Sequence, residues 1–256
     1  MNRSLFILII FTIITFIFIW QNKKNLVKES SSQLPDVLVV GTNAEYPPFS
    51  FMEQDRLVGL DIDLMYEIAK RLGKKLVFKN VPFDILLPKI QTGEYHILAA
   101  GLSPSEQREA TLSFTTPYWE KDPLIIVQLP STPPLTSSAS LSEKRIVVNE
   151  GFTSDFYVSS VPNVTIKRLN TMTEALLLLQ NNQVDAFVTA LSPFKALLTD
   201  EQQAQFSYHV IPDIFDSYAL AISKKHPFLF AAIDKIIRDL IQDGTREQLL
   251  KKWQLL

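Results

Sequence analysis

Short apolar runs alternate with amphipathic stretches along most of the chain. An uninterrupted apolar run is typical of a buried strand, whereas apolar residues spaced three and four apart indicate a helix. The stretch DIDLMYEIAKRLG shows the helical spacing clearly, and its last residue, Gly73, is a typical helix stop. The first half of the chain therefore predicts a strand, a helix, a strand, a helix and a strand, in that order, at residues 37–40, 61–73, 76–81, 83–93 and 96–101.

A second series of the same kind follows a stretch rich in Pro, Ser and Thr at residues 123–140. Within it, Ser192 followed by Pro193 predicts a helix that begins with a serine cap and a first-position proline. The order of strands and helices in both series favours α/β sheets with helices on their faces. Two series of similar size imply two lobes. The strands expected in the second series lie at residues 145–149, 164–169, 185–190 and 218–223.

The N-terminus differs in kind from the rest of the chain. Residues 5–20 form an uncharged apolar run with Arg3 before it and two lysines after it. This run is long for the apolar part of a signal peptide and short for a spanning helix, so residues 1–22 are expected to be either a signal peptide or an uncleaved membrane anchor. The polar residues 23–35 are expected to form a tether. Either alternative places the remainder of the chain outside the cytoplasm, in the periplasm or an equivalent compartment, with anchoring to the inner membrane by residues 5–20 as one option.

Composition narrows the chemistry. The net charge of −2 gives no electrostatic reason to expect a nucleic-acid partner. The absence of cysteine excludes disulfides, thiolate nucleophiles and cysteine-bound zinc. The three histidines show no metal-ligand spacing, and no Ser-His-Asp arrangement is visible. We therefore expect no metal, no cofactor and no hydrolase chemistry.

One short stretch, AGLSPSEQR, combines two positive features. Ser103 can cap a helix whose first residue is Pro104, and Glu106 then stands at the capping-box position. The free N–H groups at such a helix start attract anions, and Arg108 adds a planar fork suited to a carboxylate. The alternative interpretation is an ordinary helix cap with a surface arginine.

Several segments together resemble one known family. VVGTNAEYPPFSF, LVGLDIDLMYEIAKRLG, VPFDILLPKIQTGEYHILAAGLSPSEQREATLSFTTPYW and QDGTREQLLKKW are similar, in this order, to the polar amino-acid class of periplasmic solute-binding proteins of ABC importers (solute-binding family 3, the glutamine-, arginine- and histidine-binding type). The resemblance implies the type II periplasmic-binding-protein fold, in which two α/β lobes are joined by two hinge strands and close over the ligand. It places lobe 1 at residues 36–126 plus 217–256 and lobe 2 at 127–216, with hinges near 124–127 and 218–222.

The same resemblance implies roles for individual residues. Arg108 would hold the α-carboxylate of an amino acid with the help of Gly101 and Ser103, and Thr153 would meet it from the second lobe. Further residues would line the pocket: Tyr46 and Phe83 as aromatic walls, and Asn43, Asn149 and Phe152 beside them. Tyr46 and Phe83 could instead be core aromatics.

Two positions bear on the rest of the ligand. Glu45 is an acid in the first loop and could select a basic side chain, although a solvated loop carboxylate is the equal alternative. Ala190 stands where the family usually has an aspartate that pairs with the ligand α-ammonium. A buried ammonium without a counter-charge is costly. Glu45, Glu150 or Asp155 could therefore substitute, or carbonyls and water could hold the ammonium, or the ligand is not an ordinary α-amino acid.

The leading hypothesis is a monomeric, non-enzymatic binding protein that captures a polar amino acid by hinge closure and delivers it to the membrane permease of an ABC importer. Two alternatives remain open. One is a dehydratase-like enzyme of the same fold that acts on a prephenate-like acid, and the other is a membrane-tethered ligand sensor.

Overall fold

The computed structural model describes residues 34–256. The expected signal peptide or anchor at residues 1–22 and most of the expected tether at 23–35 lie outside this part of the chain. Within residues 34–256, none of the helices combines the length and apolar character that a membrane crossing requires. Residues 37–256 form one unit, which contains two five-stranded sheets and a small three-stranded sheet.

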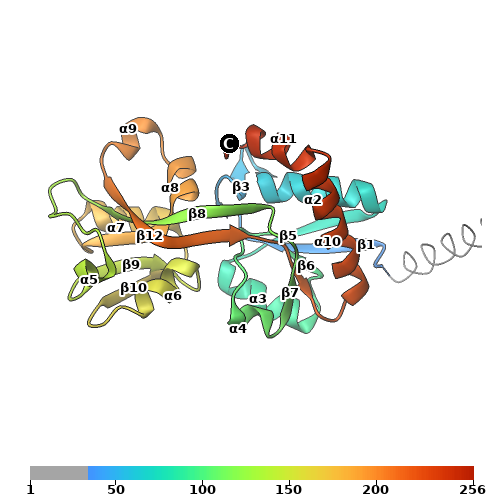
Figure 1. Ribbon diagram of the computed structural model, residues 1–256, viewed down its shortest axis with the longest axis horizontal. Coiled ribbons are helices and arrows are strands. Elements are labelled where there is room, and N and C mark those ends of the chain that lie inside the picture. Colours follow the sequence, from blue (N-terminus) through green and yellow to red (C-terminus); the bar gives the residue numbers. More distant parts are fainter. Residues whose placement is uncertain (1–33) are drawn as a thin grey trace, which may run out of the picture. The chain divides into compact units, whose positions relative to one another are not determined.

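The first five-stranded sheet has the order β5-β1-β6-β13-β7. Its strands β5, β1 and β6 are parallel, and β13 runs antiparallel to both of its neighbours. Helices α2, α10 and α11 lie on one side of this sheet in Figure 1, and α3 lies on the other. The bounds of these elements are β1 Val37–Thr42, α2 Leu60–Leu72, β5 Lys75–Asn80, α3 Phe83–Thr92, β6 Ile97–Leu98, β7 Leu112–Phe114, β13 Ala221–Ser223, α10 Pro227–Gln242 and α11 Thr245–Lys252.

A short antiparallel meander extends from the end of β1. It consists of β2 (Glu45–Tyr46), β3 (Ser50–Glu53) and β4 (Arg56–Val58). The meander leads directly into α2, and it fixes the position of Tyr46, which is buried.

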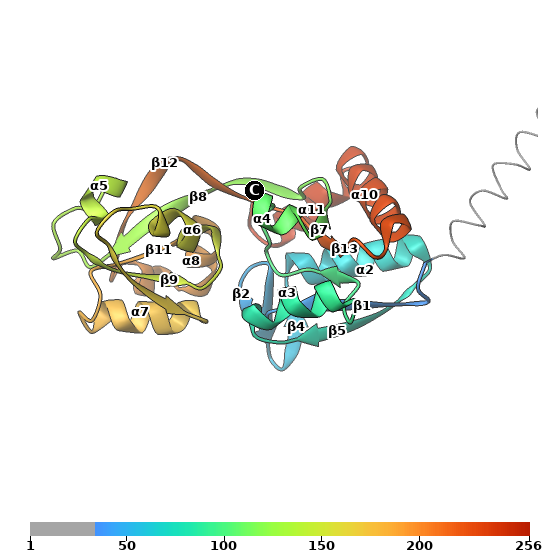
Figure 2. The same cartoon turned by 90° about the horizontal axis from the view of Figure 1, so that it is seen from below.

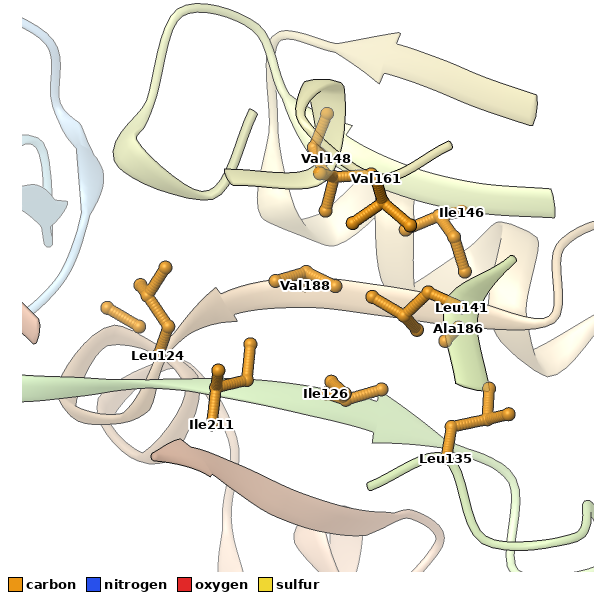
Figure 3. Packing of buried hydrophobic residues seen from close by; sticks show 12 residues of the cluster. Leu124, Ile126, Leu135, Leu141, Ile146, Val148, Val161, Ala186, Val188 and Ile211 are labelled. Atoms are coloured by element: carbon orange, nitrogen blue, oxygen red, sulfur yellow. The ribbon is translucent and has the colours of Figure 1, made fainter. Parts of the chain in front are cut away.

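The second sheet has the order β10-β9-β11-β8-β12. Its apolar residues form a continuous core, and Figure 3 shows Ile126, Ile146 and Val188 as part of this cluster. The helices around it can be followed in Figure 2. The bounds are α5 Ser138–Leu141, β9 Arg145–Asn149, α6 Thr153–Ser159, β10 Thr165–Leu169, α7 Met172–Gln180, β11 Ala186–Ala190, α8 Leu191–Leu197 and α9 Asp200–Gln203.

Two long antiparallel strands connect the sheets, β8 (Trp119–Gln128) and β12 (Ser207–Tyr218). The chain enters β8 from β7 of the first sheet and leaves β12 toward β13 of the same sheet. Residues 124–127, which were predicted to be a hinge, pair with β11 inside the second sheet. Residues 119–123 pair with β12 alone, so the crossing segment of β8 precedes the predicted one.

The expected start of the helix near residue 192 is wrong. Helix α8 begins at Leu191 with Ala190 as its N-cap, so Ser192 and Pro193 are its second and third residues. Asp122 on β8 explains the difference, because its Oδ1 accepts hydrogen bonds from both the backbone N–H and the hydroxyl of Ser192 at 3.0 and 2.9 Å. A side chain from a distant strand therefore satisfies the helix start that the sequence assigned to a local cap.

Candidate functional site

A small cavity lies where the first lobe, the second lobe and the crossing strand β12 meet. Its volume is about 10 Å³, which is room for roughly one water molecule. A larger surface hollow of about 420 Å³ adjoins it and shares Ser103, Arg108 and Thr153 with it. The residues that line the small cavity are Tyr46, Phe83, Gly101, Ser103, Arg108, Phe152, Thr153 and Asp216. All of them except Asp216 belong to the set that the sequence predicts as ligand-binding.

Three aromatic rings form one side of the cavity. The Phe152 ring at the start of α6 lies 4.6 Å from the Phe83 ring and 5.2 Å, edge-on, from the Tyr46 ring, measured between centroids. Phe152 therefore contacts both of the aromatic walls predicted in the first lobe. Aromatic faces in this arrangement can bury the aliphatic part of a ligand and attract a cationic head.

Arg108 lines this cavity, and its side chain is buried. Its Nη1 donates to the carbonyl oxygen of Ser103 and its Nη2 to that of Gly151, both at 2.7 Å, so it links the two lobes. Its Nε is buried without a hydrogen-bond partner. Burial lowers the pKa of Arg108, and the nearby negative charge of Asp216 opposes that shift. These two hydrogen bonds to carbonyl oxygens leave the other N–H donors of the guanidinium free for an anion.

The helix that carries Arg108 begins two residues later than predicted. It is α4, Glu106–Glu109, and its N-cap is Ser105, whose hydroxyl accepts from the Arg108 backbone N–H at 3.3 Å. The predicted cap at Ser103 and the first position at Pro104 are therefore wrong. Ser103 instead donates its hydroxyl to Asp216 on β12.

Asp216 on β12 is the cavity residue that the sequence analysis missed. Its Oδ1 accepts from the Ser103 hydroxyl at 2.6 Å, and the hydroxyls of Thr153 and Tyr218 lie close enough to lower its pKa. Burial raises the pKa of Asp216, while these hydroxyls and the charge of Arg108 pull it back down. The hydroxyls of Ser103 and Thr153, which were expected to face a ligand carboxylate, thus contact a carboxylate of the chain itself.

Gly101 brings the backbone close to Tyr46. Its φ is +56°, and a Cβ at this position would lie 2.6 Å from Cδ1 of the Tyr46 ring. Its backbone N–H donates to Oδ2 of Asp61 at 2.7 Å, and Asp61 also accepts from the Tyr118 hydroxyl. Asp61 is completely buried, and burial raises its pKa to about 7. A buried carboxyl at the start of α2 therefore holds the loop that forms one wall of the cavity.

A second buried carboxyl supports the hinge side of the cavity. The Tyr46 and Tyr218 hydroxyls are 3.2 Å apart, and Tyr218 donates to Oδ2 of Asp122 at 2.9 Å. Burial raises the pKa of Asp122 to about 6, against the effect of its hydrogen bonds from Ser192 and Tyr218. This chain of hydroxyls ties the meander of the first lobe to both crossing strands.

Four predicted residues do not line the cavity. The Asn43 side chain donates to the Val81 carbonyl, and that of Asn149 donates to the Leu169 carbonyl. Ala190 is buried in the apolar core of the second lobe. Glu45 is exposed, and its pKa is raised by partial burial and by the negative charge of Glu174 in the second lobe.

The other acids considered as substitutes at the Ala190 position also lie away from the cavity lining. Asp155 accepts from the Gly151 backbone N–H and forms an ion pair with Arg168, both at 3.0 Å. Glu150 is exposed to solvent. Within residues 34–256, no group of His, Cys, Asp or Glu side chains is arranged to hold a metal ion.

Comparison with known proteins gives consistent matches over the whole described part. Residues 38–255 match the sequence model of the bacterial extracellular solute-binding proteins, family 3. A probable histidine-binding protein of Campylobacter jejuni is 29% identical over 244 residues, which cover 94% of each chain. ABC transporter arginine-binding protein 1 of Escherichia coli is 25% identical and aligns with 83% of this chain and 88% of its own. The solved structure of an ancestral arginine-binding protein bound to arginine superposes with a TM-score of 0.79 at 32% identity, over 86% of this chain and 98% of that one. The two-lobed fold predicted from the sequence is confirmed.

Proposed function

Because the chain belongs to the bacterial extracellular solute-binding proteins of family 3, we propose that it captures a basic amino acid between its lobes and delivers it to the permease of an ABC importer. Arg108 is the observation that carries the proposal. It is a buried guanidinium with free donors, it faces an aromatic cavity, and it already contacts both lobes. An arginine fork in this setting suits the α-carboxylate of an amino acid.

The preference for a basic side chain rests on charge. Glu45 on the meander of the first lobe is close enough to Glu174 on α7 of the second lobe for the negative charge of Glu174 to raise the pKa of Glu45. Two carboxylates in this relation repel each other, and a cationic side chain between the lobes would relieve the repulsion. The similarity to histidine- and arginine-binding proteins points in the same direction.

Capture requires motion, because a cavity of about 10 Å³ has no room for an amino acid. The two crossing strands are the segments where the lobes can separate, and closure over a ligand would then follow the hinge mechanism of two-lobed proteins. We take the lobes as residues 36–126 with 217–256 and residues 127–216, except that residues 124–126 of β8 pair inside the sheet of the second lobe. We further propose a monomer outside the cytoplasm, with residues 5–20 serving for export or anchoring.

The relatives reported above are binding proteins, and this finding favours a binding protein over an enzyme. The experiment is isothermal titration calorimetry of the full chain with L-arginine, L-histidine, L-lysine and L-glutamine. At least one of the basic amino acids should bind with a dissociation constant in the micromolar range or below. Tight binding of glutamine with no binding of the basic amino acids would contradict the basic preference.

Arg108→Ala should weaken the binding of the best amino acid by about 100-fold or more, because it leaves the ligand carboxylate buried without its partner. Arg56→Ala is the matched control, since Arg56 is an exposed arginine on β4 outside the cavity. Thermal unfolding by circular dichroism would establish that both variants are folded. Unchanged affinity in folded Arg108→Ala would overturn the role of this residue.

A further inference from the structure

The neighbouring strands β11, β8 and β12 of the second sheet differ in whether they carry an aspartate near the cavity. On β8, Leu124 pairs with Ala190 of β11 on one side, and Asp122 pairs with Asp216 of β12 on the other. The acid that β11 lacks at Ala190 is therefore present on both β8 and β12, two residues further along the strands. Ala190 and Asp216 are separated by two strand spacings of about 4.8 Å each and by about 7 Å along the strands.

Both carboxylate oxygens of Asp122 already accept hydrogen bonds within the chain. Its Oδ1 accepts two hydrogen bonds from Ser192 and its Oδ2 accepts one from Tyr218. It does not line the cavity. A ligand could recruit Asp122 only by releasing the start of α8.

Asp216 is placed differently, because its buried carboxylate lines the same cavity as Arg108. It accepts a hydrogen bond from the neutral hydroxyl of Ser103, and the other polar side chains beside it include the neutral hydroxyls of Thr153 and Tyr218. The hydrogen bonds of the Arg108 guanidinium go to carbonyl oxygens, and Asp216 forms no ion pair among the residues that the structure describes. A buried carboxylate without a contacting cation is costly, and an ammonium group in the cavity would compensate it.

We propose that Asp216 is the counter-charge for the α-ammonium group of the ligand, in the role that Ala190 cannot fill. The inference rests on the proposed function and completes it. Arg108 and Asp216, both in the lining of one cavity, then match the two ends of a zwitterion, and the acids at Glu45 and Glu174 remain for the side chain. With an alanine at position 190, the counter-charge lies on β12 instead of β11. The class of ligand stays the same.

The test compares two ligands that differ only in the α-amino group, L-arginine and 5-guanidinopentanoate, and in parallel L-histidine and 3-(imidazol-4-yl)propionate. Calorimetry with the full chain gives the ratio of the two dissociation constants for each pair. The native protein should prefer the amino acid. Asp216→Asn should weaken binding of the amino acid by about 100-fold or more and leave the des-amino analogue within about threefold, so that the preference disappears.

Asp213→Asn is the matched control, because Asp213 is an exposed acid on the same strand, and it should leave both constants unchanged. Asp216→Ser serves as a second variant, since a serine keeps a hydrogen-bonding group near Ser103, and it should abolish the preference as well. If folded Asp216→Asn and Asp216→Ser weaken both ligands equally, or neither, the role of Asp216 is wrong while the proposed function stands. If the native protein binds none of arginine, histidine and lysine, the proposed function fails and the inference falls with it.

Discussion

Asp61 is a completely buried acid whose two oxygens accept from the Gly101 backbone N–H and the Tyr118 hydroxyl. Burial raises its pKa from 3.8 to about 7. Between these two values the unfolded chain gives up the proton and the folded chain keeps it. The contribution of Asp61 to the free energy of unfolding is therefore complete below about pH 4 and is lost as the pH rises through 7.

Asp61→Asn should remove this pH dependence. An asparagine can accept from Gly101 with its oxygen and donate to Tyr118 with its amide, so it imitates the protonated acid. The free energy of unfolding of Asp61→Asn relative to the native protein should rise between pH 4 and pH 8 by up to about 4 kcal/mol. Urea unfolding at a series of pH values measures it. Asp122 is another carboxyl whose pKa is raised by burial. It is present in both proteins, so its contribution to the free energy of unfolding cancels in the difference. If the difference in unfolding free energy between the two proteins does not change with pH, the raised pKa of Asp61 in the folded protein is contradicted.

Sequence reasoning found most of the cavity residues and missed Asp216 for a physical reason. Tyr46, Phe83, Arg108 and Thr153 lie in motifs where local spacing and resemblance agree, and these residues do meet around one cavity. Asp216 lies on a strand whose pairing with β8 shifts register twice, once just before Phe215 and once just after Asp216. Alternation therefore cannot indicate which face its side chain takes, because each shift reverses the pattern.

At the scale of the elements, the alternation of strands and helices was predicted well and their first residues less well. The glycine stop at Gly73 is confirmed, since it ends α2 in the left-handed conformation. The predicted starts of α4 and α8 were wrong because distant acids bind the residues involved. Asp216 accepts the hydroxyl of Ser103, and α4 is capped by Ser105 two residues later. Asp122 accepts hydrogen bonds from Ser192 at the start of α8. A local sequence pattern does not show which serine a distant strand will bind.

The two ends of α2 lead to a prediction on stability. Gly59, its N-cap, has a φ of +133°, and a Cβ there would lie 2.1 Å from the backbone oxygen of Phe49. Gly73 has a φ of +65° with nothing within 4 Å of the corresponding position. Gly73→Ala should therefore cost about 1–2 kcal/mol of unfolding free energy, for the left-handed backbone alone. Gly59→Ala should cost more than about 3 kcal/mol, because the backbone must also move.

Urea unfolding of both variants at one pH measures the difference, and the free energy of unfolding of the native protein is the reference. The meander that carries Tyr46 packs against this helix start through Phe49. Gly59→Ala should therefore also weaken ligand binding, whereas Gly73→Ala should not. Equal costs for the two substitutions would show that the close approach at Gly59 relaxes without effect on stability.

At the scale of the whole unit, two kinds of contact join the lobes beside the cavity. One is polar, from the Arg108 guanidinium to the Gly151 carbonyl. The other is apolar, from the Phe152 ring to the rings of Tyr46 and Phe83. The polar contact uses the same guanidinium that the ligand carboxylate needs, and Phe152 stands between the two walls that would hold the ligand side chain. The ligand and the opposite lobe thus compete for the same side chains. Closure of the lobes without ligand therefore opposes the binding of ligand.

Phe152→Ala should shift that balance toward separated lobes in the ligand-free protein. Each aromatic pair contributes about 0.5–1.5 kcal/mol, so removing both changes the ratio of closed to open molecules by roughly 5- to 150-fold. Small-angle X-ray scattering of the ligand-free protein should show a larger radius of gyration for Phe152→Ala than for the native protein, and saturation with the bound amino acid should remove the difference. Phe228→Ala, at an exposed phenylalanine of α10, is the control and should leave the radius unchanged. Identical scattering of Phe152→Ala and the native protein without ligand would mean that the ring does not hold the lobes together, and the competition would then rest on Arg108 alone.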